Sequence, residues 1–498
     1  MSWGWRPWRV VGLVALVLLA TWNLTGWPAT WFDEGSHLMV PKSVVRYGVY
    51  ADYDSAGFRY FGATLGVGPT VLLPIAAVFK LFGVGLVQAR LVMACYLVLA
   101  VVAFHRLARR LAGDGAALIA SALLVLAPGV GTLEFGRQVL GEAPGLLFLC
   151  LGMAELVIAA GAPRPWRLAG AGALLGLAAV TKYQLLGVVM LGLCLAWLLS
   201  WWRRAGSLKA FVIPVLAAGV VFAAWQVCLL GYLGPSSLTD NFRYVRQAAG
   251  GAAFALSLER ALASGRLLLE PGMLLGALVP AIGYGTALAL RRDDQSHGWR
   301  ILMGFTLGAL SWFVVASIGW RRYAYPGLAL ACLPTGALLV ELLRVRDREG
   351  RPEPVTALRW AGVWWLAAMM VLPLPVVLPR IFVPRPQEAR AMAETLNREV
   401  SSGATVATWE PEMTFLTDHR YRVPPQALLS VAVAHVWAGG PSPASRYDFM
   451  AGGAPDYVLE GPFARGIGLF PENRLRAAFE PVQSHGPYVL LRRKAGGQ

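Results

Sequence analysis

Residues 10–24 read VVGLVALVLLATWNL, and the polar stretch WFDEGSH follows close behind at residues 31–37. Arg6 and Arg9 precede the apolar run, and no small-residue cleavage site follows it, so an uncleaved membrane helix is favoured over a secretory signal peptide. The basic flank predicts that this helix runs from the cytoplasm to the outside. The polar stretch then belongs to a long outer loop at residues 26–85.

The whole chain has the composition of a polytopic membrane protein. Of its 498 residues, 57% are hydrophobic and only 14% are charged, and the mean hydropathy is +0.55. A soluble domain carries about 25% charged residues. The net charge of +16 does not indicate nucleic-acid binding, because the arginines lie between apolar runs of membrane-spanning length. All five cysteines fall inside these runs, which argues against a disulfide framework and a cysteine-based zinc site.

Ten further apolar runs predict membrane helices, which gives eleven spans in all. An odd number of spans with a cytoplasmic N-terminus places the C-terminus outside. The positive-inside rule supports this threading, since the six segments predicted to be cytoplasmic hold 18 Lys or Arg in 60 residues, whereas the outer loop 26–85 holds four. The ten runs are 86–104, 114–128, 144–160, 168–181, 185–201, 210–231, 271–290, 301–319, 324–343 and 360–378, and the six cytoplasmic segments are 1–9, 105–113, 161–168, 202–209, 291–300 and 344–359.

Two regions are predicted to lie outside the membrane. Within the first outer loop, the apolar stretch 68–83 is too short and too interrupted by proline to cross, so it predicts an amphipathic helix on the membrane surface. Residues 380–498 have dense, balanced charge and predict a small α/β domain, which leaves residues 1–379 as the transmembrane domain. The elements predicted in the outer domain are a helix at 386–400, strands at 404–409 and 456–460, and a hairpin of 479–482 with 488–492.

Charged residues at the outer ends of the spans are the candidates for chemistry. The sequence has no phosphate-binding P-loop, dinucleotide-binding glycine motif, HExxH or GxSxG motif, which disfavours ATP-driven transport and nicotinamide chemistry. The candidate carboxylates are Asp33, Glu34 and Glu142, and the candidate cations are Arg59, Arg137, Lys182, Arg321 and Arg322.

Each candidate also has a simpler interpretation. The acids of the first loop could be solvated, Arg59 could extend to lipid headgroups, and the Arg321–Arg322 pair could form a salt bridge to the C-terminal domain. Lys182, however, lies in the short gap between two apolar runs, where a lysine is costly unless it has an anionic partner. Cations that bind a phosphate leaving group, together with a carboxylate that takes a proton from an acceptor, suit sugar transfer from a polyprenyl phosphate.

Five landmarks resemble those of the GT-C glycosyltransferases, in particular the branch that contains the protein O-mannosyltransferases and the lipid A aminoarabinose transferase (glycosyltransferase family 39). The resemblance covers residues 1–345 and is strongest over 27–185. The landmarks are the Asp-Glu pair after the first span, Arg-Tyr-Phe at 59–61, an acidic residue before a proline at 142–144, Thr-Lys at 181–182 and Arg-Tyr-x-x-Pro at 322–326.

The resemblance implies a role for each matching residue. Asp33 is expected to be the catalytic carboxylate that activates the acceptor, Glu142 the second acidic residue, and Arg59, Lys182 and Arg322 the cations that bind the lipid phosphate. Two departures leave the acceptor open: Gly62-Ala63-Thr64 stands where the aminoarabinose enzyme has a lysine, and the β-trefoil insert of the eukaryotic mannosyltransferases is absent.

Further candidates come from position alone. Arg137 and Arg321 are additional candidates for phosphate binding, and Glu34 and His37 are weaker candidates for holding a divalent cation.

The sequence therefore predicts an inner-membrane GT-C glycosyltransferase with about eleven membrane helices and a small C-terminal extracytoplasmic α/β domain. A single displacement with inversion is expected, with a polyprenyl-phosphate sugar as donor and a lipid, glycan or protein as acceptor. The bilayer is the other expected partner, and no nucleic acid is expected. The alternative is a transporter or flippase for a lipid-linked glycan or another anionic substrate, in which the same charges would line a translocation path.

The threading makes a prediction about the C-terminus. A reporter that is active only in the exported compartment, fused after Gln498, is expected to be active because the positive-inside rule places this end outside. An inactive exported reporter, together with an active cytoplasmic reporter at the same position, would contradict the threading.

Overall fold

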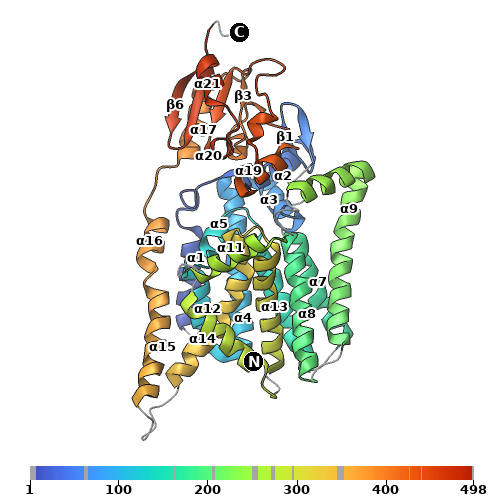
Figure 1. Ribbon diagram of the computed structural model, residues 1–498, viewed down its shortest axis with the longest axis vertical. Coiled ribbons are helices and arrows are strands. Elements are labelled where there is room, and N and C mark those ends of the chain that lie inside the picture. The colour runs from blue at the N-terminus through green and yellow to red at the C-terminus, as the bar shows by residue number, and fades with distance from the viewer. Residues whose placement is uncertain are drawn as a thin grey trace.

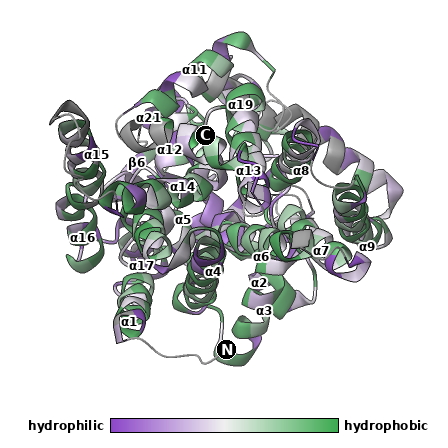
Figure 2. Ribbon diagram, turned by 90° about the horizontal axis from the view of Figure 1, so that it is seen from below, coloured by the Kyte–Doolittle hydropathy of each residue, from purple (hydrophilic) through white to green (hydrophobic). Residues whose placement is uncertain are grey.

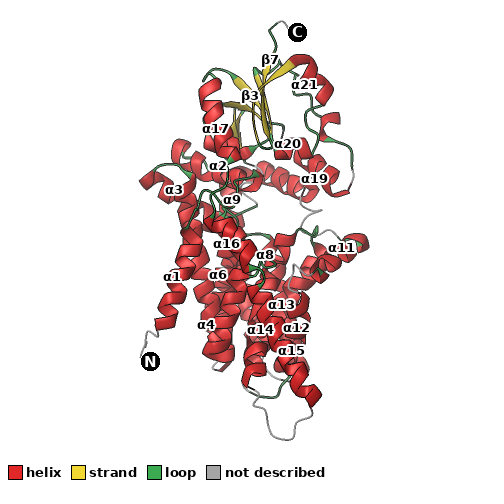
Figure 3. Ribbon diagram, turned by 90° about the vertical axis from the view of Figure 1, so that its left-hand side faces the viewer, coloured by secondary structure: helices red, strands yellow, loops and turns green. Residues whose placement is uncertain are grey.

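The protein is a long bundle of helices with a sheet-containing region on one end (Figure 1, Figure 3). The computed structural model describes residues 7–60, 66–161, 164–204, 208–248, 256–270, 275–293, 296–344, 353–425, 427–438 and 440–495. The sheet region and the first outer loop share one end of the bundle, and the N-terminus lies toward the other (Figure 1). Gly62-Ala63-Thr64 lies outside the described residues.

Each predicted span overlaps a helix of the bundle, but the ends differ: the span predicted at 360–378 is a helix at Glu353–Val371, and the helix at the span predicted at 210–231 continues to Ala248. Seen from below, the bundle helices are coloured mostly as hydrophobic (Figure 2). By length and composition, six stretches among the described residues could cross a membrane, so the number of spans stays a prediction. The bundle helices are α1 (Pro7–Thr21), α4 (Leu86–Leu126), α6 (Glu142–Gly161), α7 (Pro165–Thr181), α8 (Gln184–Trp202), α9 (Lys209–Ala248), α12 (Leu275–Ala289), α13 (Ser296–Ala316), α14 (Tyr325–Arg344) and α15 (Glu353–Val371).

The 41 residues of α4 form two arms that fold back on each other. His105 Nδ1 lies 3.2 Å from the hydroxyl of Ser121, although 16 residues of straight helix would separate them by about 24 Å. The chain reverses at Gly113, whose φ of 82° is a left-handed value that glycine adopts readily. The two spans predicted at 86–104 and 114–128 are therefore two separate helical arms.

Close backbone contacts hold the bundle together. A Cβ atom added to Gly304 of α13 would lie 2.6 Å from the backbone nitrogen of Ala196 in α8, and one added to Gly308 would lie 2.8 Å from that of Gly192. Small residues allow helices in a membrane to approach this closely, because dispersion contacts replace the hydrophobic effect there.

Short elements cover the end of the bundle that faces the sheet region. The predicted surface helix is present as α3 (Pro69–Phe82), which buries Val71, Leu72, Ile75 and Phe79 and leaves Leu81 and Phe82 more than 70% exposed. The other elements are α2 (Phe32–Tyr47), β1 (Asp52–Asp54), β2 (Gly57–Arg59), α5 (Thr132–Arg137), α11 (Leu258–Leu269), the 3-10 helix η2 (Arg321–Ala324) and α16 (Leu374–Phe382).

The C-terminal region contains a five-stranded sheet of order β4-β3-β5-β7-β6. β3 pairs in parallel with β4 and β5, and β7 pairs antiparallel with β5 and β6. The predicted helix, two strands and hairpin are confirmed as α17, β3, β5 and β6–β7. The elements are α17 (Glu388–Glu399), β3 (Thr405–Ala407), α18 (Pro411–Leu416), β4 (Arg420–Arg422), α19 (Leu428–Ala438), η3 (Pro443–Ser445), β5 (Tyr457–Glu460), α20 (Pro462–Gly466), α21 (Glu472–Ala478), β6 (Phe479–His485) and β7 (Tyr488–Arg493).

Candidate active site

Four of the predicted site residues come together between the bundle and the first outer loop. Arg322 Nη1 lies 2.5 Å from Asp33 Oδ2, and Lys182 Nζ contacts Glu142 Oε1. The two pairs share a neighbour, because the side-chain charges of Arg322 and Lys182 each lie 5.5 Å from the ring centre of Tyr323. We refer to Asp33, Glu142, Lys182 and Arg322 as the charge cluster.

Each member of the charge cluster lies at the end of a different element. Asp33 is the second residue of α2, Glu142 begins α6, Lys182 directly follows α7, and Arg322 is in η2. Helix ends bring side chains from distant parts of the chain to one level of a bundle. All four were predicted as charged residues at the ends of spans, and the structure brings them together.

The charge cluster is balanced and largely withdrawn from water. Glu142 and Lys182 are 5% and 8% exposed, and two carboxylates face two cations. Asp33 Oδ2 and Glu142 Oε2 have no hydrogen-bond partner among the described residues, so the contact of Asp33 with Arg322 is an ion pair without hydrogen-bond alignment. Both oxygens can therefore accept a hydrogen bond from a bound molecule.

Aromatic rings fix the position of the Arg322 guanidinium. Its central carbon lies 4.4 Å from the ring centre of Trp320, 5.4 Å from that of Trp31 and 5.5 Å from that of Tyr323. Rings at this distance attract a cation and shield it from water. Trp31 and Trp320 were not among the predicted site residues, although each lies close in sequence to a charged candidate.

Glu34 is held in a buried ion pair that the sequence analysis missed. Arg90 donates from Nε to Glu34 Oε1 at 2.8 Å and from Nη2 to Oε2 at 2.5 Å, and both side chains are fully buried. Arg90 Nη1 also donates to the backbone carbonyls of Leu24 and Pro28. An arginine inside a predicted membrane span was the available signal, because such a residue needs a partner.

The second weak metal candidate, His37, lies one helical turn after Asp33. Its Nδ1 lies 2.7 Å from the carbonyl oxygen of Val139, which can only accept, so Nδ1 carries the proton. Burial lowers the pKa of His37 and favours the neutral ring.

The two weak metal candidates, Glu34 and His37, both make other contacts in this structure. The carboxylate of Glu34 is occupied by Arg90, and among the described residues no three His, Cys, Asp or Glu side chains are arranged to hold a metal ion.

The other three predicted cations make contacts elsewhere. Arg59 pairs with Asp52 at 2.5 Å and Asp54 at 3.5 Å within the β1–β2 hairpin. Arg137 is fully buried and donates to the backbone carbonyls of Leu19 and Trp22 at the end of α1. These contacts give the two arginines structural partners.

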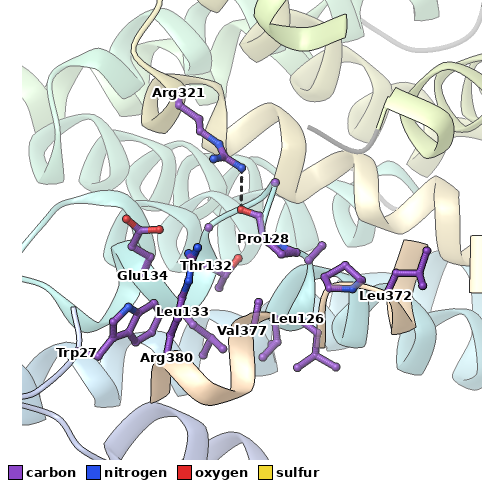
Figure 4. A pocket seen from close by; sticks show the side chains of 15 residues that line it. Trp27, Leu126, Pro128, Thr132, Leu133, Glu134, Arg321, Leu372, Val377 and Arg380 are labelled. Carbon is purple, nitrogen blue, oxygen red and sulfur yellow. Dashed lines mark hydrogen bonds between the residues drawn. The ribbon is translucent and has the colours of Figure 1, made fainter. Parts of the chain in front are cut away.

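Arg321 lines a cavity beside α5 and α16 (Figure 4). Its guanidinium donates to the carbonyl of Pro128 at 3.0 Å. The cavity has a volume of about 490 Å³, and its lining includes Trp27, Glu134 and Arg380. The two neighbouring arginines of η2 therefore lie in different environments: Arg322 belongs to the charge cluster, and Arg321 lines the cavity.

Comparison with known proteins identifies the architecture. A family model described as dolichyl-phosphate-mannose-protein mannosyltransferase matches residues 67–230. No curated protein matches the chain. The fold is similar to ArnT from Cupriavidus metallidurans bound to undecaprenyl phosphate, with a TM-score of 0.65, 18% identity and 98% of each chain covered.

A second solved structure has the same kind of fold. The archaeal oligosaccharyltransferase AglB from Archaeoglobus fulgidus, in complex with an inhibitory peptide and a dolichol-phosphate, matches with a TM-score of 0.54 and 13% identity. The match covers 99% of this chain and 75% of that one. The family match and the fold together confirm the prediction of a membrane glycosyltransferase with the GT-C fold.

The buried Glu34–Arg90 pair predicts a large effect on stability. Arg90→Met leaves a buried carboxylate without its cation, and breaking such a pair costs about 3–5 kcal/mol. Thermal unfolding of the detergent-solubilised protein is expected to show a clear fall in melting temperature.

Two controls make this prediction specific. Arg476→Gln removes an exposed ion pair with Glu472 and should change the melting temperature little. The double variant Glu34→Met/Arg90→Met removes both charges and should recover much of the loss. Equal melting temperatures for Arg90→Met and Arg476→Gln would refute a structural role for the buried pair.

Proposed function

We propose that the protein transfers a sugar from a polyprenyl-phosphate donor to an acceptor at the outer face of the cytoplasmic membrane, with Asp33 as the general base. The observation that carries this proposal is the charge cluster, in which two carboxylates and two cations from four chain segments meet at one end of the bundle. ArnT, which has the same fold, has been solved with undecaprenyl phosphate.

The cations of the charge cluster have the chemistry that the leaving group needs. When the bond between the anomeric carbon and the phosphate oxygen breaks, a second negative charge develops on the carrier phosphate. Lys182 and Arg322 would stabilise it by charge-assisted hydrogen bonds, which are stronger than neutral ones. Burial strengthens this effect, because little water competes for the phosphate.

The carboxylates complete the displacement. Asp33 accepts the proton of the acceptor while the nucleophilic atom forms its bond to the anomeric carbon, so that the polyprenyl phosphate leaves and the anomeric configuration inverts. Glu142 contacts Lys182 and thereby holds this side chain in place. Asp33 and Glu142 are both members of ion pairs, so donor binding exchanges part of these contacts for contacts with phosphate.

The acceptor is a lipid, glycan or protein, and AglB, which was solved with an inhibitory peptide, shows that the fold accommodates a peptide in that enzyme. The N-terminus is proposed to be cytoplasmic and the C-terminal region extracytoplasmic.

A transporter or flippase for a lipid-linked glycan is the alternative. The grouping of the four charges at helix ends favours transfer, since translocation needs polar groups along the path.

Asp33→Asn is the direct test of the base. The change keeps the shape of the side chain but removes its basicity, so sugar transfer should fall by about 10²-fold or more. Donor binding should persist, because the change removes a negative charge beside the phosphate. The measurement is product formation from a radiolabelled polyprenyl-phosphate sugar by the purified protein.

The matched control for Asp33→Asn is Asp448→Asn, which changes an exposed aspartate of the C-terminal region that pairs with Arg474. It should leave transfer unchanged. Near wild-type transfer by Asp33→Asn would exclude Asp33 as the base.

The neighbouring arginines give a second test. Arg322→Gln and Lys182→Gln should each weaken donor binding and lower turnover by about 10²-fold, as expected for the loss of one donor that stabilises developing charge. Arg321→Gln should have a clearly smaller effect, because Arg321 donates to Pro128 beside the cavity, whereas Arg322 pairs with Asp33. Equal losses in Arg321→Gln and Arg322→Gln, measured as donor affinity and turnover, would contradict this assignment.

A further inference from the structure

The first turn of α2 sends three consecutive side chains to three separate partners. Phe32 contacts the C-terminal region, Asp33 contacts Arg322, and Glu34 contacts Arg90. Helix α2 lies at the junction between the bundle and the C-terminal region (Figure 3). The direction of Asp33 is therefore set by what holds its two neighbours.

Two aromatic residues of the C-terminal region hold Phe32. Its ring centre lies 3.9 Å from that of Phe463 and 6.4 Å from that of Trp409, and the last two rings meet edge to face at 5.3 Å. The buried carboxylate of Glu410 accepts hydrogen bonds from the backbone N–H groups of Phe463 and Ala464. Glu410 thus joins the loop after β3, which carries Trp409, to the start of α20, which carries Phe463.

The second contact is a close approach of two helices. A Cβ atom added to Gly35 would lie 2.2 Å from the backbone nitrogen of Glu412 at the start of α18. Real Cβ atoms do not approach backbone atoms this closely, so only glycine at position 35 allows α18 to rest on α2.

The third contact is a lysine that caps α18. Lys42 is 1% exposed, and its ammonium group donates to the carbonyls of Thr414, Phe415 and Thr417 at 2.9 to 3.0 Å. A cation at this position satisfies carbonyls that have no partner within the helix and interacts favourably with the helix dipole. The carboxylate of Asp418 then pairs with Lys42 and Arg46.

These contacts occupy one side of α2. An α-helix turns by about 100° per residue, so the four residues that meet the C-terminal region fall within an arc of roughly 80°. Asp33 and Glu34 lie outside this arc. The four residues are Phe32, Gly35, Lys42 and Arg46.

We propose that the C-terminal region is a working part of the active site, in which Trp409 and Phe463 are positioning residues that orient Asp33 through Phe32. This inference rests on the proposed role of Asp33 as the base. Displacing a catalytic group by about 1 Å lowers the rate by up to about 10²-fold. Lys182 also contacts Glu142, and Arg322 also contacts the rings of Trp320 and Tyr323, so both cations are expected to keep their places when the contact with Phe32 is lost.

The first experiment compares Phe463→Leu with Phe449→Leu in the full-length protein. Both changes remove a ring from the same apolar core of the C-terminal region, but Phe449 packs on Phe470 and Phe479 instead of Phe32. Phe463→Leu should lower kcat about 10-fold with donor affinity unchanged, Phe449→Leu should keep kcat, and Phe463→Tyr should restore it. Equal losses of kcat in the two Leu variants would overturn the proposal.

A second pair of variants tests the same contact through the backbone. Gly35→Ala forces α2 and α18 apart, whereas Gly466→Ala, in α20, meets no atom within 4 Å. Gly35→Ala should lower kcat as Phe463→Leu does, and Gly466→Ala should retain wild-type turnover. Wild-type turnover in Gly35→Ala would also overturn the proposal.

Hydrogen exchange separates this proposal from the proposed function. The N–H of Gly35 donates to the carbonyl of Trp31 at 2.9 Å, and amides of residues 31–36 should exchange faster in Phe463→Leu but not in Phe449→Leu. Unchanged exchange in Phe463→Leu would refute the contact whatever the reaction is. If Phe463→Leu shows faster exchange but wild-type turnover, while Asp33→Asn is inactive, the positioning role of Phe463 is refuted and the role of Asp33 as base is not. Transfer by Asp33→Asn would refute the base itself.

Discussion

The ion pair of Glu34 and Arg90 is the interaction on which the site depends. It lies wholly out of water, and the guanidinium that binds the carboxylate also holds the carbonyls of Leu24 and Pro28. One side chain of α4 thereby fixes both the end of the first helix and the start of α2. Desolvating two charges is expensive, and only such complete pairing and hydrogen bonding offsets it. The position of Asp33 follows, since it lies between the anchored Glu34 and the ring of Phe32.

The charge cluster has to offer cations to a phosphate and also has to keep those cations paired when no substrate is bound. A site that binds a phosphate must present cations, but unpaired cations at a membrane boundary would be costly in the absence of substrate. Pairing each cation with a carboxylate lowers that cost, and the rings around Arg322 keep the guanidinium in place without neutralising it. The same pairing brings Asp33 close to where the leaving group would bind. Under the proposed function, the same four side chains therefore provide both the stability of the empty site and its reactivity.

The helices and several strands could be predicted from the sequence because apolar periodicity and chain length report on them directly. The meeting of Asp33, Glu142, Lys182 and Arg322 also followed from local signals, since each is a charged residue at the end of a span. Arg59, Arg137 and Arg321 gave the same signal but have other partners, which pattern alone does not distinguish. The contact of Phe32 with Trp409 and Phe463 joins residues about 380 and 430 positions apart and leaves no local pattern.

The contact between Phe32 and the C-terminal region also bears on how the protein is made. Synthesis proceeds from the N-terminus, so Phe32 is available long before Trp409 and Phe463 emerge. Until then one side of α2 is uncovered, because α18, which packs on Gly35 and is capped by Lys42, has not yet been synthesised. A nascent chain whose bundle is already inserted therefore carries the turn of Asp33 without its cover. Under the proposed positioning of Asp33, this turn reaches its final arrangement only after Trp409 and Phe463 have folded against Phe32.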